Sequence, residues 1–350
     1  MKNRTRAMQL GVRVLAAPDK FRGTATADEV CAAIAAAVES AGGTCVTQPM
    51  ADGGEGTLAA FGGANRSAVV TGPLGYPVTA GWRLREDGLA VIEAAQANGL
   101  LLAGGSQGND PVAATSRGVG ELIAAAIQAG AARVLVGLGG SASTDGGMGA
   151  VTALTERGML SAATVTPIEV CCDVDTRFTD AARIFGPQKG ADPTQIAQLT
   201  VSLRNQRSEY LRRFGMDVES LPGSGAAGGL AGGLAAIGAT LVSGFDRIVD
   251  ELGLDALIRN ADVVITGEGS FDATSLTGKV VGGVARLAQA AGVPVVAVVG
   301  VVDERSAAQL PDELRVVSLT GLFGKDRSRT DTAAAVRDAV AGYLSELRQR

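Results

Sequence analysis

Four short segments of the chain combine glycine with charged or hydroxyl side chains directly after apolar runs. They are PDKFRG (18–23), ADGGEGT (51–57), GLGGSASTDGG (137–147) and ITGEGSFD (265–272). Ligands in open α/β sheets bind beyond the carboxyl ends of the strands, where loops of this composition converge. Each segment alone could be an ordinary connection between a strand and a helix. Together, three of them with a carboxylate beside glycine, they predict one ligand site.

The third segment is the strongest candidate for binding an anion. Gly139 and Gly140 stand with the hydroxyls of Ser141 and Ser143 before a predicted helix. Backbone N–H groups and hydroxyls arranged in this way can surround a phosphate. Asp145 ends the segment and could bind magnesium, polarise a hydroxyl, or cap the helix. The companion segments favour a ligand role.

Lysines and carboxylates supply the charges that phosphoryl transfer needs. Lys20, Lys189 and Lys279 lie in glycine-containing segments rather than on a polar helix face, where a lysine would simply be solvated. Asp173 and Asp175 follow an apolar run that predicts a strand over residues 168–174, whose alternation would point both carboxylates to the same side. They are candidates for a general base with a metal-bound neighbour, or they form an ordinary polar strand end.

The chain contains no histidine. This excludes Ser-His-Asp and Cys-His catalysis, HExxH metalloproteases and zinc bound by imidazole. Proton transfer therefore falls to carboxylates, lysine, tyrosine or cysteine. A divalent metal would be held by oxygen ligands, which suits magnesium.

Composition excludes two other classes of protein. A net charge of −5 and an aromatic content of 3% argue against binding of nucleic acid. No apolar run approaches the roughly 18 residues of a membrane span. The four cysteines show no CxxC spacing, which indicates reduced thiols and a cytoplasmic protein.

Apolar runs alternate with alanine-rich periodic stretches, which predicts an α/β fold with largely parallel strands. Further strands are expected at 12–17, 45–50, 133–138, 262–266, 294–299 and 316–319, and helices at 26–40, 119–129, 193–214, 279–291 and 332–348. Residues 67–102 are β-rich, with hairpin turns near 72–75 and 86–88. We therefore predict two α/β domains. One is Rossmann-like, discontinuous (1–66 and 262–350) and mostly parallel; the other (67–261) is inserted and has a mixed sheet.

Two literal motif matches do not carry their usual meaning. Gly278 and Lys279 are followed by Val280, and no upstream glycine completes a P-loop. GSGAAG (223–228) matches GxGxxG, but it follows Leu221 and Pro222 instead of a strand. It predicts a close-packed, glycine-rich helix start rather than a dinucleotide site.

Read together, these segments resemble the glycerate kinase family of ATP-dependent kinases, which is unrelated to P-loop kinases. The resemblance extends from Leu15 to Gly300, in the family's order, and implies two α/β domains with the active site in the cleft between them. The implied reaction converts ATP and D-glycerate into ADP and phosphoglycerate, with magnesium. The matching segments are APDKFRGTATADEV (17–30), PMADGGEGT (49–57), ATSRGVGELI (114–123), GLGGSASTDGGMGA (137–150), CDVD (172–175), FGPQKGA (185–191), GSGAAGGL (223–230) and ITGEGSFD with TGK (265–279).

The resemblance also implies roles for individual residues. The catalytic candidates are Asp173, Asp145 and Lys20, with the two aspartates as alternatives for the general base. The phosphate- and nucleotide-binding candidates are Gly139, Gly140, Ser141, Ser143 and Lys279, with Lys20 also approaching a phosphate. The candidates beside the substrate or the metal are Asp52, Gly53, Gly54, Glu55, Lys189, Glu268 and Asp272. Asp52 and Glu268 would hold magnesium. On charge alone, and not from the resemblance, Arg22 or Arg117 could clasp the carboxylate of glycerate.

The chain departs from the family pattern after CDVD, where the stretch to FGPQKG is also a few residues shorter, at Thr274, and in having no histidine. Thr176 follows CDVD where the family has Asn-Pro-Leu, and Thr274 stands where the family has glutamine. The alternatives are therefore a kinase for another small hydroxy acid, or a catalytically weak homologue that binds nucleotide or a phosphorylated acid. An oxidoreductase would rest only on the misplaced GxGxxG. Which hydroxyl is phosphorylated, and whether the protein is a monomer or a homodimer, stay open.

Overall fold

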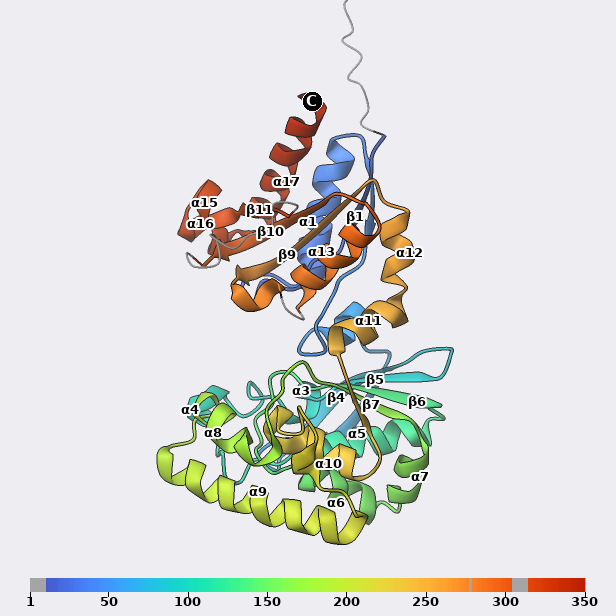
Figure 1. Cartoon of the computed structure of the whole chain (residues 1–350), viewed down its shortest axis with the longest axis vertical. Helices are drawn as coiled ribbons and strands as arrows, with labels where there is room; N and C mark the ends of the chain where they lie inside the picture. Colours follow the sequence, from blue (N-terminus) through green and yellow to red (C-terminus); the bar gives the residue numbers. More distant parts are fainter. Residues whose placement is uncertain (1–10, 277–278, 304–313, 350) are drawn as a thin grey trace, which may run out of the picture. The chain divides into compact units, whose positions relative to one another are not determined.

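The computed structural model describes residues 11–276, 279–303 and 314–349 (Figure 1). The chain divides into two compact units, a first unit of residues 1–51 and 248–350 and a second unit of residues 52–247. The sequence had placed these boundaries after residues 66 and 261. Thr277 and Gly278 of the TGK motif lie outside the described residues.

The first unit is built on a five-stranded sheet in which all pairs are parallel. The strand order is β11-β10-β9-β1-β2. Numbered along the chain, this is 2-1-3-4-5, the flavodoxin-like order of doubly wound folds, and it confirms the predicted Rossmann-like architecture. The strands are β1 (Arg13–Ala16), β2 (Thr44–Thr47), β9 (Val263–Phe271), β10 (Val295–Val302) and β11 (Arg315–Ser318).

Helices cover both faces of this sheet (Figure 1). Because side chains alternate along β1, Val14 packs in the same core cluster as α1 (Ala27–Ser40) and α17 (Thr332–Gln349). On the opposite face, α13 (Val280–Ala290) packs against β9 and β10. The predicted capping box at Thr26 and Glu29 is present and starts α1. The remaining described helices are α12 (Leu254–Arg259), α15 (Leu319–Phe323), α16 (Lys325–Thr330) and the 3₁₀ helix η5 (Ala273–Leu276).

The second unit contains a six-stranded sheet in the order β3-β4-β5-β6-β7-β8. The pairs β3–β4 and β4–β5 are antiparallel, whereas the pairs from β5 to β8 are parallel. This is the mixed sheet that the β-rich pattern predicted. The strands are β3 (Arg66–Thr71), β4 (Pro77–Leu84), β5 (Leu89–Glu93), β6 (Arg133–Gly137), β7 (Ile168–Cys171) and β8 (Thr240–Val242).

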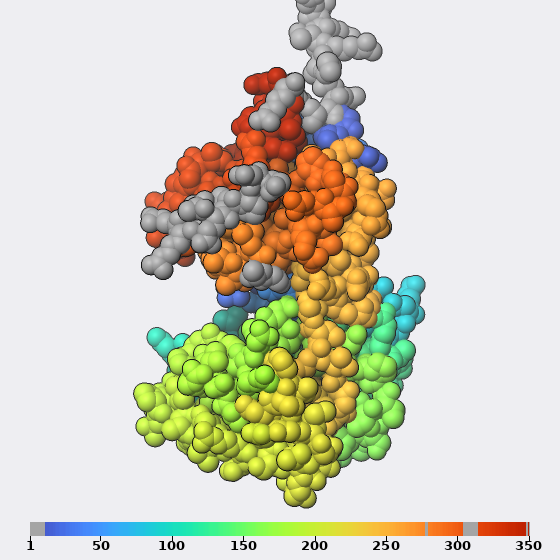
Figure 2. Space-filling model, in the orientation of Figure 1, coloured from blue at the N-terminus to red at the C-terminus, as the bar shows by residue number. Residues whose placement is uncertain are grey.

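The helices α5 (Arg117–Gln128), α6 (Met148–Glu156), α9 (Pro193–Phe214) and α10 (Leu230–Ala236) share one core cluster with this sheet. Helix α9, drawn in yellow-green, lies on the outside of the second unit (Figure 2). It begins with a capping box at Asp192, and its bounds are those that the sequence predicted. The other helices are α2 (Thr57–Ala60), α3 (Ala95–Asn98), α4 (Gly105–Gly108), α7 (Leu160–Val165), α8 (Ala181–Phe185) and α11 (Gly244–Leu252), with the 3₁₀ helices η1 (Phe178–Asp180), η2 (Pro187–Lys189), η3 (Val218–Ser220) and η4 (Ala226–Gly229).

Strand β7 is shorter than the sequence predicted. Its pairing with β8 stops at Cys171, opposite Val242, because β8 has only three residues. Asp173 and Asp175 therefore lie in a loop and not on a strand, so the prediction that strand alternation aligns them is wrong. Within the described part of the chain, no helix is long and apolar enough to cross a membrane.

Candidate active site

Four parallel strands of the second unit end at the same edge of its sheet. Their last residues are Glu93, Gly137, Cys171 and Val242. The loops that follow β6, β7 and β8 carry residues 138–147, 172–175 and 243–244. The loop 52–57 joins them through Gly53, whose carbonyl accepts a hydrogen bond of 2.9 Å from the N–H of Leu138. This edge is where an α/β sheet binds its ligands.

Glycine allows the backbones of these loops to touch. A Cβ atom on Gly139 would lie 2.3 Å from the N atom of Glu55, and one on Gly244 would lie 2.2 Å from the carbonyl oxygen of Asp52. Gly53 has a φ of +87°, and a Cβ there would lie 2.5 Å from that of Cys171. The close approach explains why the segments are rich in glycine. It gathers the predicted residues Asp52, Gly53, Gly54, Glu55, Gly139, Gly140 and Asp173.

Asp173, one of the two predicted bases, is an exposed carboxylate held by a backbone hydrogen bond. Its Oδ1 accepts a 2.9 Å hydrogen bond from the N–H of Gly244, the first residue of α11. Loss of hydration raises the pKa of Asp173 to about 6, and the nearby carboxylate of Asp52 adds to the rise. Hydrogen bonds from Gly244, the Ser243 hydroxyl and the N–H of Phe245 oppose it. The residue nevertheless stays exposed to solvent, so a substrate can reach it.

Asp52 is held by its own loop. Its Oδ1 accepts a 3.1 Å hydrogen bond from the N–H of Gly54. The N–H groups of Gly56 and Leu58 donate to the buried Glu93, each at 3.1 Å, which fixes the start of α2. These hydrogen bonds therefore hold the loop and the carboxylate of Asp52 in a fixed position.

Asp145, the other predicted base, is surrounded by donors. Six hydrogen bonds between 2.8 and 3.3 Å reach its two oxygens and leave little room for a substrate hydroxyl. This arrangement suits a residue that shapes the loop. The donors are the Oγ1 of Thr115, the N–H and Oγ of Ser116, the Oγ of Ser143, and the N–H groups of Gly147 and Gly149.

The loop 138–147 is supported by residues that the sequence analysis did not name. Asn98 is fully buried; its amide donates to Ser143 Oγ at 2.9 Å and accepts from the Ser143 N–H at 3.2 Å. Tyr210, also fully buried on α9, donates to the carbonyl of Gly146 at 2.8 Å. These roles depend on packing between distant segments, so neither residue stood out in the sequence.

The GSGAAG segment packs against the same loop. Ala227 adopts a left-handed conformation with a φ of 52°, and the next two glycines are also left-handed. The carbonyl of Gly228 accepts a 3.0 Å hydrogen bond from the N–H of Gly146. The segment follows the 3₁₀ helix η3 rather than a strand and opens α10, as expected from the missing dinucleotide context.

Lys189 lies beneath the loop and not on its surface. The residue is 2% exposed, and its ammonium donates to Ser141 Oγ at 3.0 Å and to the Ser143 carbonyl at 2.5 Å. Loss of hydration lowers its pKa to about 7, against the opposite effect of Asp145. Arg117, one candidate for clasping a carboxylate, is already paired with Glu156 and Glu121.

The first unit has its own group of charged residues, at the point where its strand order reverses. The loop after β1 carries Asp19 and Lys20, and the N–H of Asp19 donates to the carbonyl of Gly267 on the adjacent strand β9 at 2.8 Å. Lys20 Nζ lies 3.6 Å from the carboxylate of Asp19. Doubly wound sheets bind ligands at this switch point between β1 and β9.

Glu268 on β9 is a buried carboxyl group in the first unit. It is 8% exposed, and its Oε1 has no hydrogen-bond partner among the described residues. Loss of hydration raises its pKa to about 7; Asp19 and Asp272 add to the rise, whereas Ser275 and Lys279 oppose it. A buried oxygen without a partner is costly unless a ligand or a cation completes its contacts.

Asp272 and Lys279 flank the short helix η5. Asp272 Oδ1 accepts from Thr274 Oγ1 at 2.5 Å and lies 3.8 Å from Lys279 Nζ. The hydroxyl of Thr274 is the largest cause of a lowered pKa at Asp272. Thr274, where the sequence departs from the family pattern, thus serves to hold a carboxylate.

No three cysteine, aspartate or glutamate side chains of the described residues form a group that could hold a metal ion by themselves. The two predicted ligands of magnesium, Asp52 and Glu268, belong to different units. Magnesium in kinases is typically held by one or two carboxylates and by the phosphates of the nucleotide. The carboxylates fit that chemistry, and Glu268 Oε1, which has no hydrogen-bond partner among the described residues, is an oxygen that could bind a cation.

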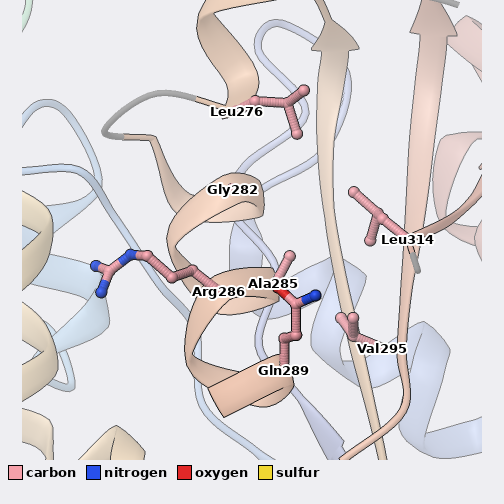
Figure 3. A pocket seen from close by; sticks show the side chains of 7 residues that line it. All are labelled: Leu276, Gly282, Ala285, Arg286, Gln289, Val295 and Leu314. Atoms are coloured by element: carbon pink, nitrogen blue, oxygen red, sulfur yellow. The ribbon is translucent and has the colours of Figure 1, made fainter. Parts of the chain in front are cut away.

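A cavity of about 200 Å³ lies in the first unit beside α13, β10 and Leu314. Figure 3 shows Arg286 pointing away from Val295 and Leu314, which line the other side. The cavity is smaller than the usual ligand pocket of about 300–1,000 Å³. No predicted site residue lines it.

Comparisons with known proteins agree with the geometry. The sequence profile of the Glycerate kinase family matches residues 14–162 and 156–341. The chain is 38% identical to the "Glycerate 2-kinase" of Escherichia coli (strain K12), over 89% of each chain. It is 36% identical to the "Glycerate kinase" of Bacillus subtilis (strain 168), over 85% of this chain and 87% of that one.

A solved structure shows the same fold. The crystal structure of a Salmonella typhimurium LT2 protein assigned as glycerate kinase 2 superimposes with a TM-score of 0.81 at 33% identity. The match covers 97% of this chain and 99% of the other. On these similarities, which extend over both units, the chain belongs to the glycerate kinase family.

Proposed function

We propose that this protein is a kinase that transfers the γ-phosphate of ATP to a hydroxyl of D-glycerate. Membership of the glycerate kinase family makes it a phosphotransferase. The observation that carries the residue-level proposal is Asp173, an accessible carboxylate whose pKa is raised to about 6. A general base works best when its pKa is close to the pH of the reaction.

In this mechanism, Asp173 accepts the proton of the glycerate hydroxyl. The hydroxyl oxygen forms a bond to the γ-phosphorus while the bond from phosphorus to the bridging oxygen breaks, and ADP leaves with the electron pair. The hydrogen bond from Gly244 holds Oδ1 of Asp173, so the carboxylate keeps a fixed direction during the transfer.

Positive groups and N–H donors neutralise the charge on the phosphates. The candidates in the second unit are the backbone at Gly139 and Gly140 and the Ser141 hydroxyl, and those in the first unit are Lys20 and Lys279. Such preorganised donors supply most of the catalysis in phosphoryl transfer. Arg22 stays the candidate for the glycerate carboxylate, since the guanidinium of Arg117 is engaged by two glutamates.

Magnesium is the metal that we propose to accompany ATP. The first unit offers Glu268, whose buried Oε1 lacks a partner among the described residues, to hold it, and the second unit offers Asp52 as a separate candidate. The ion would supply neutralisation of phosphate charge.

The name of the Escherichia coli relative supports the 2-hydroxyl as the acceptor. The product 2-phosphoglycerate is a direct substrate of enolase, whereas 3-phosphoglycerate needs a mutase first. Coupling the reaction to enolase with and without a mutase therefore identifies the product.

We also propose that the protein is cytoplasmic. The free thiols of its four cysteines support this proposal; they are Cys31, Cys45, Cys171 and Cys172.

The experiment that tests the function is an ADP-release assay with magnesium-ATP and a panel of small hydroxy acids. We expect turnover with D-glycerate and a loss of turnover in Asp173→Asn. Turnover with only a different acid would support the proposed kinase activity but would assign it another substrate. Binding of ATP without turnover of any acid would contradict the proposal and favour a sensor protein.

A further inference from the structure

Lys189 is a buried cation that makes no direct contribution to the mechanism above. It ends the 3₁₀ helix η2, and only 2% of its surface is exposed. Burial of an ammonium group is unfavourable unless its hydrogens are satisfied. Both recorded acceptors belong to the anion-binding candidate loop, namely Ser141 Oγ and the carbonyl of Ser143. The lysine therefore acts on that loop from inside the protein.

The direction of the hydrogen bond to Ser141 follows from chemistry. In its ammonium form, Lys189 has hydrogens and no lone pair on Nζ, so Nζ donates and Ser141 Oγ accepts. The hydroxyl proton of Ser141 is then left for another acceptor, and none is recorded among the described residues. Ser143 is different, because its Oγ accepts from Asn98 and donates to Asp145. Of these two serines, Ser141 is the one whose hydroxyl retains a proton to donate.

The position of Lys189 is fixed by its backbone. Asn109 donates through one amide nitrogen to the carbonyl of Lys189 at 2.9 Å and to that of Ala142 at 3.2 Å. The next residue, Gly190, has a φ of +91°, and a Cβ there would lie 2.1 Å from the carbonyl oxygen of Ser106. The turn at 187–190 and the loop at 141–145 are thus joined through Asn109, which preorganises the ammonium beneath Ser141.

We propose that Lys189 is a positioning residue that makes the Ser141 hydroxyl a fixed hydrogen-bond donor to an anionic oxygen of the bound ligand. That oxygen belongs to a phosphate of ATP or to the carboxylate of the acceptor acid. The inference deepens the proposed function and rests on it. It replaces the sequence-based expectation that Lys189 lies beside the substrate with a role exerted through Ser141.

A double-mutant cycle on the full-length protein tests this inference. The proteins are wild type, Ser141→Ala, Lys189→Met and the double variant, with Ser208→Ala on the exposed face of α9 as the matched control. We measure kcat, the KM of ATP, the KM of glycerate, and the melting temperature. Each single variant should raise the KM of the same substrate about tenfold, as expected for a lost hydrogen bond to a charged group. The double variant should add little, and Ser208→Ala should change nothing.

The substrate whose KM rises identifies the anionic oxygen. Additive effects of the two substitutions would overturn the proposal, as would a lower melting temperature with unchanged KM values. If Lys189→Met does not fold, Ser141→Ala still tests the inference. Unchanged KM values for both substrates in Ser141→Ala would contradict it, because this variant lacks the hydroxyl but keeps Lys189. Absence of turnover in the wild type would instead count against the proposed function. Calorimetric dissociation constants for ATP and glycerate would then replace the KM values in the same cycle.

Discussion

Asp173 and Asp145 are loop carboxylates of the same unit, yet their surroundings suit them to different tasks. Asp145 receives six hydrogen bonds, whereas Asp173 is exposed and lies close to a second carboxylate. Hydrogen bonds to a carboxylate stabilise its charged form, whereas dehydration and like charge destabilise it. Their neighbours in space, which the sequence does not display, are the reason why we propose Asp173 rather than Asp145 as the general base.

Asp173→Asn should lower kcat by about 10²–10⁴-fold, the usual contribution of a general base. In the wild type, kcat/KM should fall as the pH drops through about 6, because the carboxylate must be ionised to accept a proton. This fall of kcat/KM at acidic pH, the acidic limb of the profile, should be absent from any residual activity of Asp173→Asn. Asp255→Asn, at an exposed position on α12, serves as the control. A wild-type acidic limb in the variant would show that another group is the base.

Asp145→Asn should reduce stability more than chemistry. An amide offers one acceptor and brings two hydrogens toward donors that already point at the site, so we expect a loss of about 2–4 kcal/mol in the free energy of unfolding. Urea denaturation measures this loss. Asp180→Asn, which removes a surface pair with Arg183, should cost less than about 1 kcal/mol. A large fall in kcat at unchanged stability would restore Asp145 as the base.

Glu268→Gln should stabilise the protein at alkaline pH. The folded pKa of about 7 exceeds the ordinary value of 4.5, so the native state holds the proton more tightly and loses stability as the pH rises from about 4.5 to 7. The cost reaches on the order of 3 kcal/mol above that window, and glutamine removes it. The change in melting temperature that Glu268→Gln causes should therefore differ in sign or size between pH 5 and pH 8.5. Equal effects at both pH values would contradict the pKa shift.

At the scale of elements, loops and short strands decide the geometry of the site. The long periodic elements, such as α1 with its capping box and α9, were predictable from spacing alone. Strand β8, three residues long, and helix α11 were not, because short elements carry too little periodicity. The missed β8 also caused the error at β7, since the end of one strand is set by the length of its partner.

Gly139→Ala tests the packing of the loops against each other. The new Cβ would lie 2.3 Å from a backbone nitrogen that cannot rotate away, so we expect a loss of about 1–3 kcal/mol in stability together with reduced turnover. Gly342→Ala in α17 is the matched control, because its Cβ meets nothing within 4 Å. A gain of up to about 1 kcal/mol is expected there from helix propensity. Equal behaviour of the two variants in denaturation would refute the packing argument.

At the scale of the whole molecule, the glycine-rich segments and their order in the chain were sufficient to predict the family and the α/β class. The supports Asn98 and Tyr210 were beyond reach, because they act through contacts between segments far apart in sequence. Lys189 was named as a candidate beside the substrate, but its burial beneath the loop could not be predicted. The division into units shows the same limit. The composition of the sequence changes near residue 67, whereas the division in the structure follows Ala51.

Residues 52–247 should fold as an isolated fragment. The unit has its own sheet and core cluster, and its two ends are adjacent, since a Cβ on Gly244 would lie 2.2 Å from the Asp52 carbonyl oxygen. We expect a single cooperative thermal transition and native near-ultraviolet circular dichroism. The control is the fragment 67–261. It lacks α2 and the preceding loop 52–56, so it should melt at a lower temperature. Comparable melting of both fragments would favour the boundary read from the sequence.

The insertion of one unit into the other has a consequence for synthesis on the ribosome. Strand β1 pairs with β2 on one side and with β9 on the other, and β9 is translated only after the whole of residues 52–247. At about 5–20 residues per second, one edge of β1 therefore waits roughly 10–40 s for its neighbour. An unpaired strand edge readily recruits other chains. The nascent protein should thus depend on a chaperone until β9 has been synthesised and has paired with β1.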